Sequence, residues 1–187
     1  MKKITLILSI LMVFGTIFSF QIFIDTSYHL TTSIKSSEGS GINFDVDDNL
    51  DYMGGRVSFL IPTEDTEDIL YGPYIGLFYN HMIIGNENFD DVNNNRKPYG
   101  ISLGINARYK AKIINEISFA VLGYGGVNSL DFFSTFATEI LIKAGLVYKN
   151  MYLMGGYETR YYKVLNNDNA NVTVNYIPIS VGVNFSF

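Results

Sequence analysis

Asp25, Ser27 and His29 are the residues whose types and spacing first suggest chemistry. Side chains two positions apart in an extended strand share a face, so this spacing places an acid, a hydroxyl and an imidazole side by side. Nucleophilic catalysis uses such a set. The competing interpretation is polar filling on the inside of a closed sheet, where a substrate has no access. We favour that interpretation and expect no catalytic residues and no enzymatic activity.

Metal and phosphate sites are the next candidates. The run from Asp45 to Asp51 opens like a calcium-binding loop. Its sixth position is Leu50, where the loop needs Gly, and its twelfth is Arg56, where it needs Glu. Gly123, Gly125 and Gly126 lie within a strand pattern instead of at a helix start, so they do not form a phosphate-binding loop. We therefore expect a solvated acidic loop, no metal site and no cofactor, and weak surface cation binding by the loop is the alternative.

The composition narrows the class of protein. The chain has 187 residues, which suits a single domain, and no cysteine, which excludes disulfides and thiolate sites. Thirteen basic residues against eighteen acidic ones argue against a nucleic-acid partner. Aromatic residues make up 15% and charged residues only 17%. The chain is apolar, yet beyond residue 20 no run reaches the roughly 20 apolar residues of a membrane helix.

The first twenty residues look like an export signal. Lys2 and Lys3 precede an almost unbroken apolar run from Ile4 to Phe20, the order of a secretory signal peptide. No A-x-A cleavage triplet marks its end, and a retained membrane anchor is the alternative. We expect residues 1–20 to be a cleaved signal and residues 21–187 to form the mature domain.

The rest of the chain alternates with period two, which is typical of strands with one apolar and one polar face. The alternation is strongest in residues 20–35, 99–112, 136–148 and 176–187. Weaker runs occupy residues 50–61, 69–81, 115–127 and 151–163, which gives about eight strands. Connections richer in Gly, Asn and Asp (36–49, 82–97, 128–132 and 164–171) alternate with shorter turns.

This pattern predicts a closed, antiparallel, eight-stranded, up-and-down transmembrane β-barrel. In lipid an open sheet edge would leave backbone groups without partners, so the sheet must close. On the proposed lipid face, aromatic residues fall near both ends of the strands, as expected for two interfacial belts. The tyrosines assigned to these belts are Tyr71, Tyr79, Tyr99, Tyr109, Tyr148 and Tyr161.

The opposite face carries the charges of the strands and should fill the lumen. An eight-stranded barrel leaves an interior just wide enough for side chains. Buried charges are stable only when they are paired, so a mixture of both signs predicts a network of ion pairs and hydrogen bonds. Its expected members are Asp25, His29, Arg56, Arg108, Glu139, Lys143, Glu158 and Arg160.

The last eight residues, Ser180 to Phe187, carry a resemblance. The order of a polar residue, Gly182, the aromatic Phe185 and a terminal Phe187 resembles the final strand of bacterial outer-membrane barrels. With the signal and the strand count, the mature chain resembles small eight-stranded barrels of the opacity and outer-membrane-protein-A type. The resemblance implies that Ser180, Gly182, Phe185 and Phe187 form a signal read by the barrel-assembly machinery.

These observations predict an integral protein of the bacterial outer membrane, exported through the periplasm and monomeric. Its partners are the membrane lipids, the assembly machinery during biogenesis and an extracellular ligand that the loop sequences do not identify. The favoured role is structural or a surface interaction of the adhesin kind, because loops on a rigid scaffold are common binding sites. A narrow or gated pore is the alternative, and a lipid-modifying enzyme is less favoured.

Overall fold

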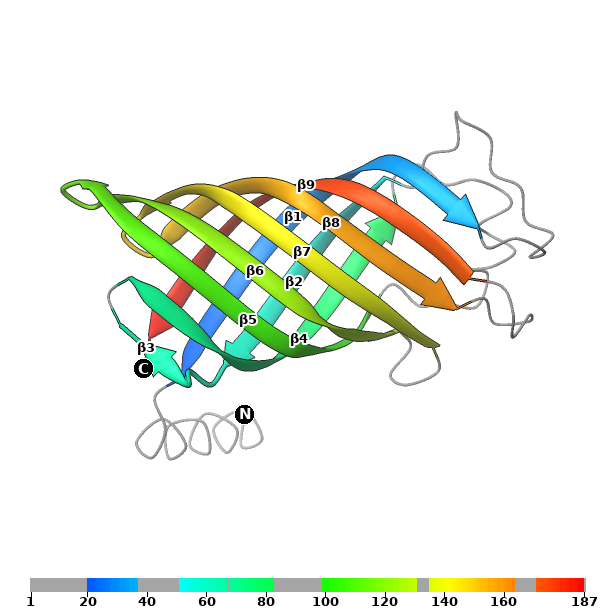
Figure 1. The fold of residues 1–187 in the computed structure, drawn as a ribbon, viewed down its shortest axis with the longest axis horizontal. Coiled ribbons are helices and arrows are strands. Elements are labelled where there is room, and N and C mark those ends of the chain that lie inside the picture. Colours follow the sequence, from blue (N-terminus) through cyan, green and yellow to red (C-terminus); the bar gives the residue numbers. More distant parts are fainter. Residues whose placement is uncertain are drawn as a thin grey trace, which may run out of the picture.

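The computed structural model describes residues 20–36, 51–66, 68–82, 99–130, 135–163 and 171–186. These residues form nine strands, and most of them run diagonally around the molecule in Figure 1. The strands are β1 (Gln21–Ser36), β2 (Tyr52–Leu60), β3 (Glu64–Asp65), β4 (Ile69–Met82), β5 (Tyr99–Ile114), β6 (Ile117–Leu130), β7 (Thr135–Tyr148), β8 (Met151–Lys163) and β9 (Asn171–Ser186). The expected signal, residues 1–20, lies outside the described part except for Phe20.

All strands except β3 form one closed antiparallel ring. The sheet order is β2-β1-β9-β8-β7-β6-β5-β4-β3, and β2 also pairs with β4, so each of these strands except β3 has a neighbour on both sides. β3 pairs only with β4, so the ring has eight members. Apart from the closing pair β1 and β9, ring neighbours follow one another along the chain, skipping only β3. The predicted closed, eight-stranded, up-and-down barrel is confirmed.

The connections at the two ends of the barrel differ. At one end, which we call the short-turn end, β5 joins β6 through Asn115 and Glu116, and β7 joins β8 through Lys149 and Asn150. The connections at the opposite end, the long-connection end, fall on residues 37–50, 83–98, 131–134 and 164–170, outside the described residues. β6 extends to Leu130, so the connection expected at 128–132 begins later than predicted.

The segment between β2 and β4 continues along the edge of β4. The N–H of Ile61 donates to the carbonyl of Pro73 at 3.0 Å, and the N–H of Thr63 donates to that of Tyr71 at 2.8 Å. Pro62 has no N–H to donate, so the regular pairing of β2 stops before it. The chain nevertheless continues alongside β4. The two-residue strand β3 follows on the same edge, pairing with Leu70 and Tyr71.

Side chains alternate between the two faces of the ring as the period-two pattern predicts. In β7, Leu141 and Lys143 are buried, while Ile140 and Ile142 are 60% and 58% exposed. In β9, Pro178 and Ser180 are buried and their odd-numbered neighbours are exposed. The pairing of β1 with β9 contains a bulge between Thr31 and Ser33, which shifts the register near the long-connection end.

The interior is only partly polar, which corrects the expectation of a polar lumen. Its short-turn half is filled by buried apolar and aromatic side chains, which we call the apolar plug. The plug consists of Phe23, Leu60, Leu70, Ala120, Leu122, Val147, Tyr152 and Met154. In the strand segments that contribute these residues, both faces are apolar. Hydropathy alone therefore does not reveal which face is inside. Among the described residues, no helix is long and apolar enough to cross a membrane.

A charge placed on the outer face should destabilise the barrel according to its depth. Ile142 lies at the middle of β7 and is 58% exposed. Ile142→Arg should lower the free energy of unfolding in lipid vesicles by about 2–4 kcal/mol, because an arginine would face hydrocarbon. Ile69→Arg, at the short-turn end of β4, is the matched control and should cost only about 0–1 kcal/mol. Equal losses in urea titrations would contradict a lipid-facing band.

Candidate functional site

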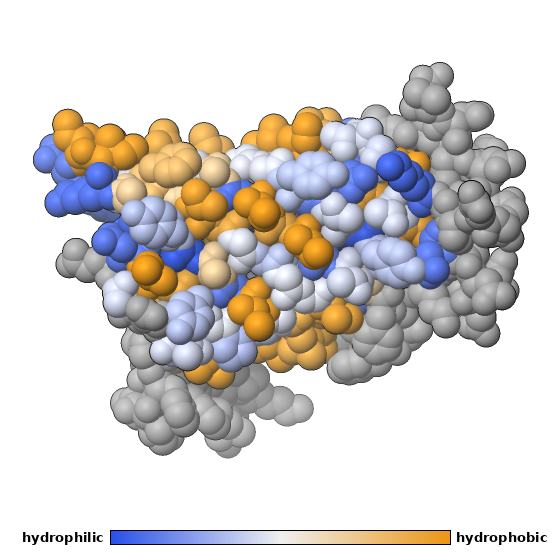
Figure 2. All heavy atoms as spheres, viewed as in Figure 1, coloured by the Kyte–Doolittle hydropathy of each residue, from blue (hydrophilic) through white to orange (hydrophobic). Residues whose placement is uncertain are grey.

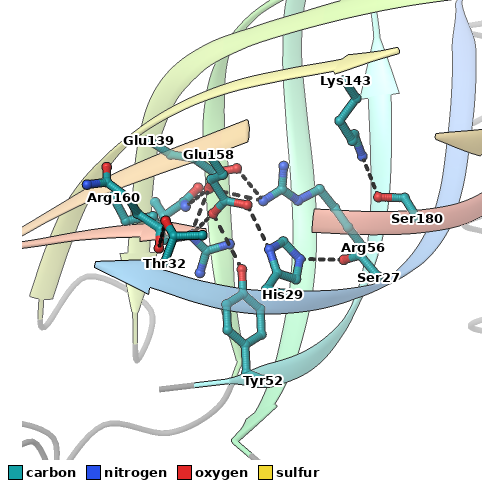
Figure 3. Close-up of polar contacts among 12 residues, drawn as sticks. Ser27, His29, Thr32, Tyr52, Arg56, Glu139, Lys143, Glu158, Arg160 and Ser180 are labelled. Atoms are coloured by element: carbon teal, nitrogen blue, oxygen red, sulfur yellow. Dashed lines mark hydrogen bonds and ion pairs between the residues drawn. The ribbon is translucent and has the colours of Figure 1, made fainter. Parts of the chain in front are cut away.

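A cluster of charged side chains occupies the middle of the lumen and is the candidate site (Figure 3). We call it the lumen network: His29 of β1, Arg56 of β2, Glu139 of β7, and Glu158 and Arg160 of β8. Each lies on the inward face of its strand, at positions that alternate with outward residues. Both carboxylate side chains are fully buried, and the site therefore depends on how their charges are balanced.

Glu139 accepts hydrogen bonds from two strands and forms an ion pair with a third. Nη2 of Arg56 lies 2.9 Å from Oε1 and 3.1 Å from Oε2 of Glu139. Nε of Arg160 lies 3.7 Å from Oε2, and the amide of Asn128 in β6 donates to the same oxygen. The carboxylate thus joins β2, β6, β7 and β8 across the lumen.

Glu158 is the second buried anion. Its Oε1 accepts hydrogen bonds from Nε of Arg160 and, at 3.4 Å, from the hydroxyl of Tyr52. Its Oε2 lies 2.8 Å from Nδ1 of His29. The two glutamates and two arginines balance one another, which is the condition under which buried charges are tolerated.

Aromatic rings hold these groups in place. The imidazole of His29 stacks on Tyr52, with ring centroids 4.0 Å apart and an interplanar angle of 13°. The guanidinium of Arg160 lies 4.7 Å from the centroid of Tyr52 and 5.9 Å from that of Tyr176. Stacking and cation–π contacts of this kind add to the ion pairing in a desolvated site.

The other predicted lumen residues also point inward but lie outside this cluster. Oδ2 of Asp25 accepts a hydrogen bond from the hydroxyl of Tyr152 at 3.3 Å. Nζ of Lys143 donates to Oγ of Ser180 at 3.1 Å. The guanidinium of Arg108 lies 5.8 Å from the ring centroid of Phe23. The structure thus divides the predicted set into a central network and separate contacts nearer the plug.

Three network partners were not predicted from the sequence. Tyr52 and Tyr176 occupy even-numbered positions, like the inward residues of their strands. A tyrosine in a strand is, however, equally common in an interfacial belt. Asn128 was expected in a connection and instead lies in β6. Their position in the inward–outward alternation was the only evidence in the sequence that they lie in the lumen. That alternation does not show which charged residues they contact.

Ser27 and His29 do approach one another as the spacing suggested. Oγ of Ser27 lies 2.6 Å from Nε2 of His29, and the carboxylate on the far side of the ring is Glu158 instead of Asp25. The cavity beside them has a volume of about 10 Å³, the space of about one water molecule. Ser27, His29 and Glu158 are all buried, so the arrangement is that of a packed interior.

The expected assembly residues occupy different environments. Ser180 and Gly182 are buried in the lumen, Phe185 is 40% exposed on the outer face, and Phe187 lies outside the described residues. A Cβ at Gly182 would collide with the ring of Tyr152 and approach the backbone oxygen of Ile24 to 2.6 Å. The fold itself therefore requires glycine at this position.

The tyrosines assigned to the belts point outward. Tyr79 pairs with Tyr99 near the long-connection end, and Tyr161 lies toward the same end of β8. Tyr71, Tyr109 and Tyr148 lie toward the short-turn end of their strands. Except for the half-buried Tyr99, all are between 38% and 52% exposed.

Comparisons with known proteins found similar solved structures but no family. No protein-family model and no curated protein matches the chain. Among solved structures, Neisserial surface protein A is similar over 89% of this chain and 97% of its own, with 16% identity and a TM-score of 0.49. At this identity the similarity is one of fold alone.

Two further structures show the same similarity at lower scores. The outer membrane enzyme PagL matches 83% of this chain and 97% of its own, with 13% identity and a TM-score of 0.40. Ail, the attachment invasion locus protein of Yersinia pestis, matches 90% of this chain and 99% of its own, with 14% identity and a TM-score of 0.37. These proteins are similar to the chain in fold, and at this identity the similarity extends to nothing finer.

Removing one buried carboxylate should be costly. Glu139→Ala leaves Arg56 without its anion and removes one partner of Arg160. We expect the free energy of unfolding to fall by about 3–5 kcal/mol, since an uncompensated buried charge remains. Glu116→Ala removes a carboxylate from an exposed ion pair with Lys149 and should cost less than about 1 kcal/mol. Similar costs in urea unfolding would show that the network is not a major source of stability.

The packed interior should not conduct. The apolar plug and the lumen network follow one another along the barrel axis. The cavity between the network side chains has a volume of only about 10 Å³. We expect no steady conductance when the folded chain is reconstituted in planar bilayers, because ions would have to displace buried, paired side chains. A reproducible conductance that Arg56→Ala increases would demonstrate a path through the network.

Proposed function

We propose that the protein is an integral outer-membrane barrel with a structural or surface-interaction role. The observation that carries this proposal is the reversal of the usual protein pattern: apolar side chains cover the outside while ion pairs are buried inside. Soluble proteins rarely expose large contiguous apolar patches, and such patches mark interaction with membranes or partners. A band that encircles the whole ring favours a membrane.

Every ring strand contributes to this apolar band. Figure 2 shows apolar side chains spread along the outer surface of the strands on the visible face. The members include Ile24, Met53, Ile75, Ile105, Val127, Ile142, Leu153 and Ile179, each between 43% and 65% exposed. The band leaves no strand of the ring with a polar exterior, as lipid contact on all sides requires.

Strand length and closure support the same proposal. A tilted strand needs about 9–11 residues to cross a bilayer. β2 has 9 residues and the other ring strands have 13 to 16. Closure of the ring removes the sheet edges that hydrocarbon would leave without hydrogen bonds. The outward tyrosines near both ends fit two membrane–water interfaces.

The role we propose is non-enzymatic. Ser27 and His29 lie in a packed interior, and the adjoining cavity holds about one water molecule. Among the described residues, no group of His, Asp and Glu side chains is arranged to hold a metal ion. We infer that the barrel is a scaffold and that any ligand is bound by the connections at the long-connection end, which would face the exterior.

The experiment that tests this proposal uses the absence of native cysteine. Asn94→Cys lies in the connection 83–98, and Asn150→Cys lies in the turn between β7 and β8. A membrane-impermeant maleimide applied to intact cells should label the first variant, and the second only after lysis. The unboiled protein should also migrate as a compact, heat-modifiable band from the outer-membrane fraction. The opposite labelling would reverse the orientation, and recovery in the soluble fraction would refute the proposal.

A further inference from the structure

An apolar depression of about 360 Å³ lies on the barrel at the short-turn end. Its volume is in the range of small-molecule sites. Its lining comes from β6, β7, β8 and β9, and the residues that define it are Ile117, Leu146, Tyr148, Met151, Leu153 and Val181. We call it the apolar groove. Of its lining residues, only the tyrosines carry a polar side-chain atom.

A polar depression of similar volume adjoins the groove. Val147 lines both, and Lys149 follows directly after Tyr148 of the groove. We call the second depression the basic rim; its ionisable residues are Asp68, Lys110, Lys112, Glu116 and Lys149. In Figure 2 apolar and hydrophilic surfaces lie side by side at the left end of the molecule, where the hairpin of β5 and β6 projects in Figure 1.

The basic rim has an excess of positive charge. Nζ of Lys149 lies 3.3 Å from Oε2 of Glu116, and both side chains are more than half exposed. Exposed pairs of this kind are weak and exchange partners readily. Within the described part of the chain, no carboxylate forms an ion pair with Lys110 or Lys112. The rim can therefore accept an anionic group without first breaking a strong contact.

Lys149 connects the rim to the groove. Its Nζ lies 5.4 Å from the ring centroid of Tyr148, a residue that lines the groove. Its backbone has φ 53°, the left-handed region that favours Gly or Asn in a tight turn. Asn115, at the equivalent position in the turn between β5 and β6, is a residue of the favoured kind. Lys149 thus occupies a turn position whose backbone conformation favours Gly or Asn.

We propose that the groove and the rim together bind a phospholipid with a net negative headgroup. One acyl chain would lie along the groove, and the phosphate would contact Lys149 and Lys112. The inference rests on the proposed function, because only a membrane barrel with its short turns toward the periplasm would meet phospholipids of the inner leaflet at this end. Neighbouring apolar and cationic surfaces match an amphiphile, and basic pockets of this kind bind anionic headgroups.

Native mass spectrometry of the folded full-length chain in detergent tests the proposal. Phosphatidylglycerol and phosphatidylethanolamine with identical acyl chains are added in separate titrations. The wild-type protein should retain phosphatidylglycerol more strongly. Lys149→Asn, which suits the turn, and Lys112→Gln should each lower that affinity about fivefold, as expected for one cation near a lipid surface. Neither should alter retention of phosphatidylethanolamine.

Two further variants separate the parts of the site. Lys35→Gln removes an exposed lysine near the long-connection end of β1 and should change neither lipid affinity. Met151→Ser in the groove should weaken retention of both lipids to the same degree. Equal retention of the two lipids by the wild-type protein, or an unchanged preference in both lysine variants, would overturn the proposal. If the unboiled wild-type protein shows no heat-modifiable band, the membrane barrel itself is refuted.

Discussion

Pairing of β1 with β9 is the contact that makes a barrel out of a sheet, and the other features follow from it. It aligns Gln21 with Ser186, residues from the two ends of the described chain, and continues to Ser36 and Val172. Without it, two long strands would present unpaired backbone groups, which neither a lipid nor a protein interior satisfies. Closure also encloses the inward side chains, and only then do Glu139 and Glu158 become buried anions that need arginines opposite them.

Closure assigns two kinds of surroundings to alternate residues of the same strand. In β7, Glu139 lies among arginines while Ile140 and Ile142 face outward. In lipid, outward apolar side chains gain little from contact with one another, because the tails around them are equally apolar. The specificity of the fold therefore comes from the inside, where charge balance and ring stacking fix which strand lies across from which.

The sequence predicted the ring more fully than it predicted the network. Strands such as β5 and β9 alternate strictly, so their faces could be read from parity alone. Parity shows that His29 points inward but not which residue lies across the lumen, since that depends on the stagger of strands far apart in the chain. Asp25 therefore seemed the acid nearest His29, whereas Glu158 of β8 occupies that place. The apolar plug was not predicted, because the inward face was expected to be polar along its whole length. Leu60, Leu70 and Leu122 lie on that face and are apolar.

The plug has a thermodynamic consequence for the molecule outside a membrane. Its side chains are packed against one another and shielded from water by the ring itself, as in the core of a water-soluble domain. Their contribution does not depend on whether the exterior meets lipid tails or detergent. In the proposed membrane setting, the barrel combines an apolar exterior that contacts lipid or detergent with an interior half that is stabilised by its own packing.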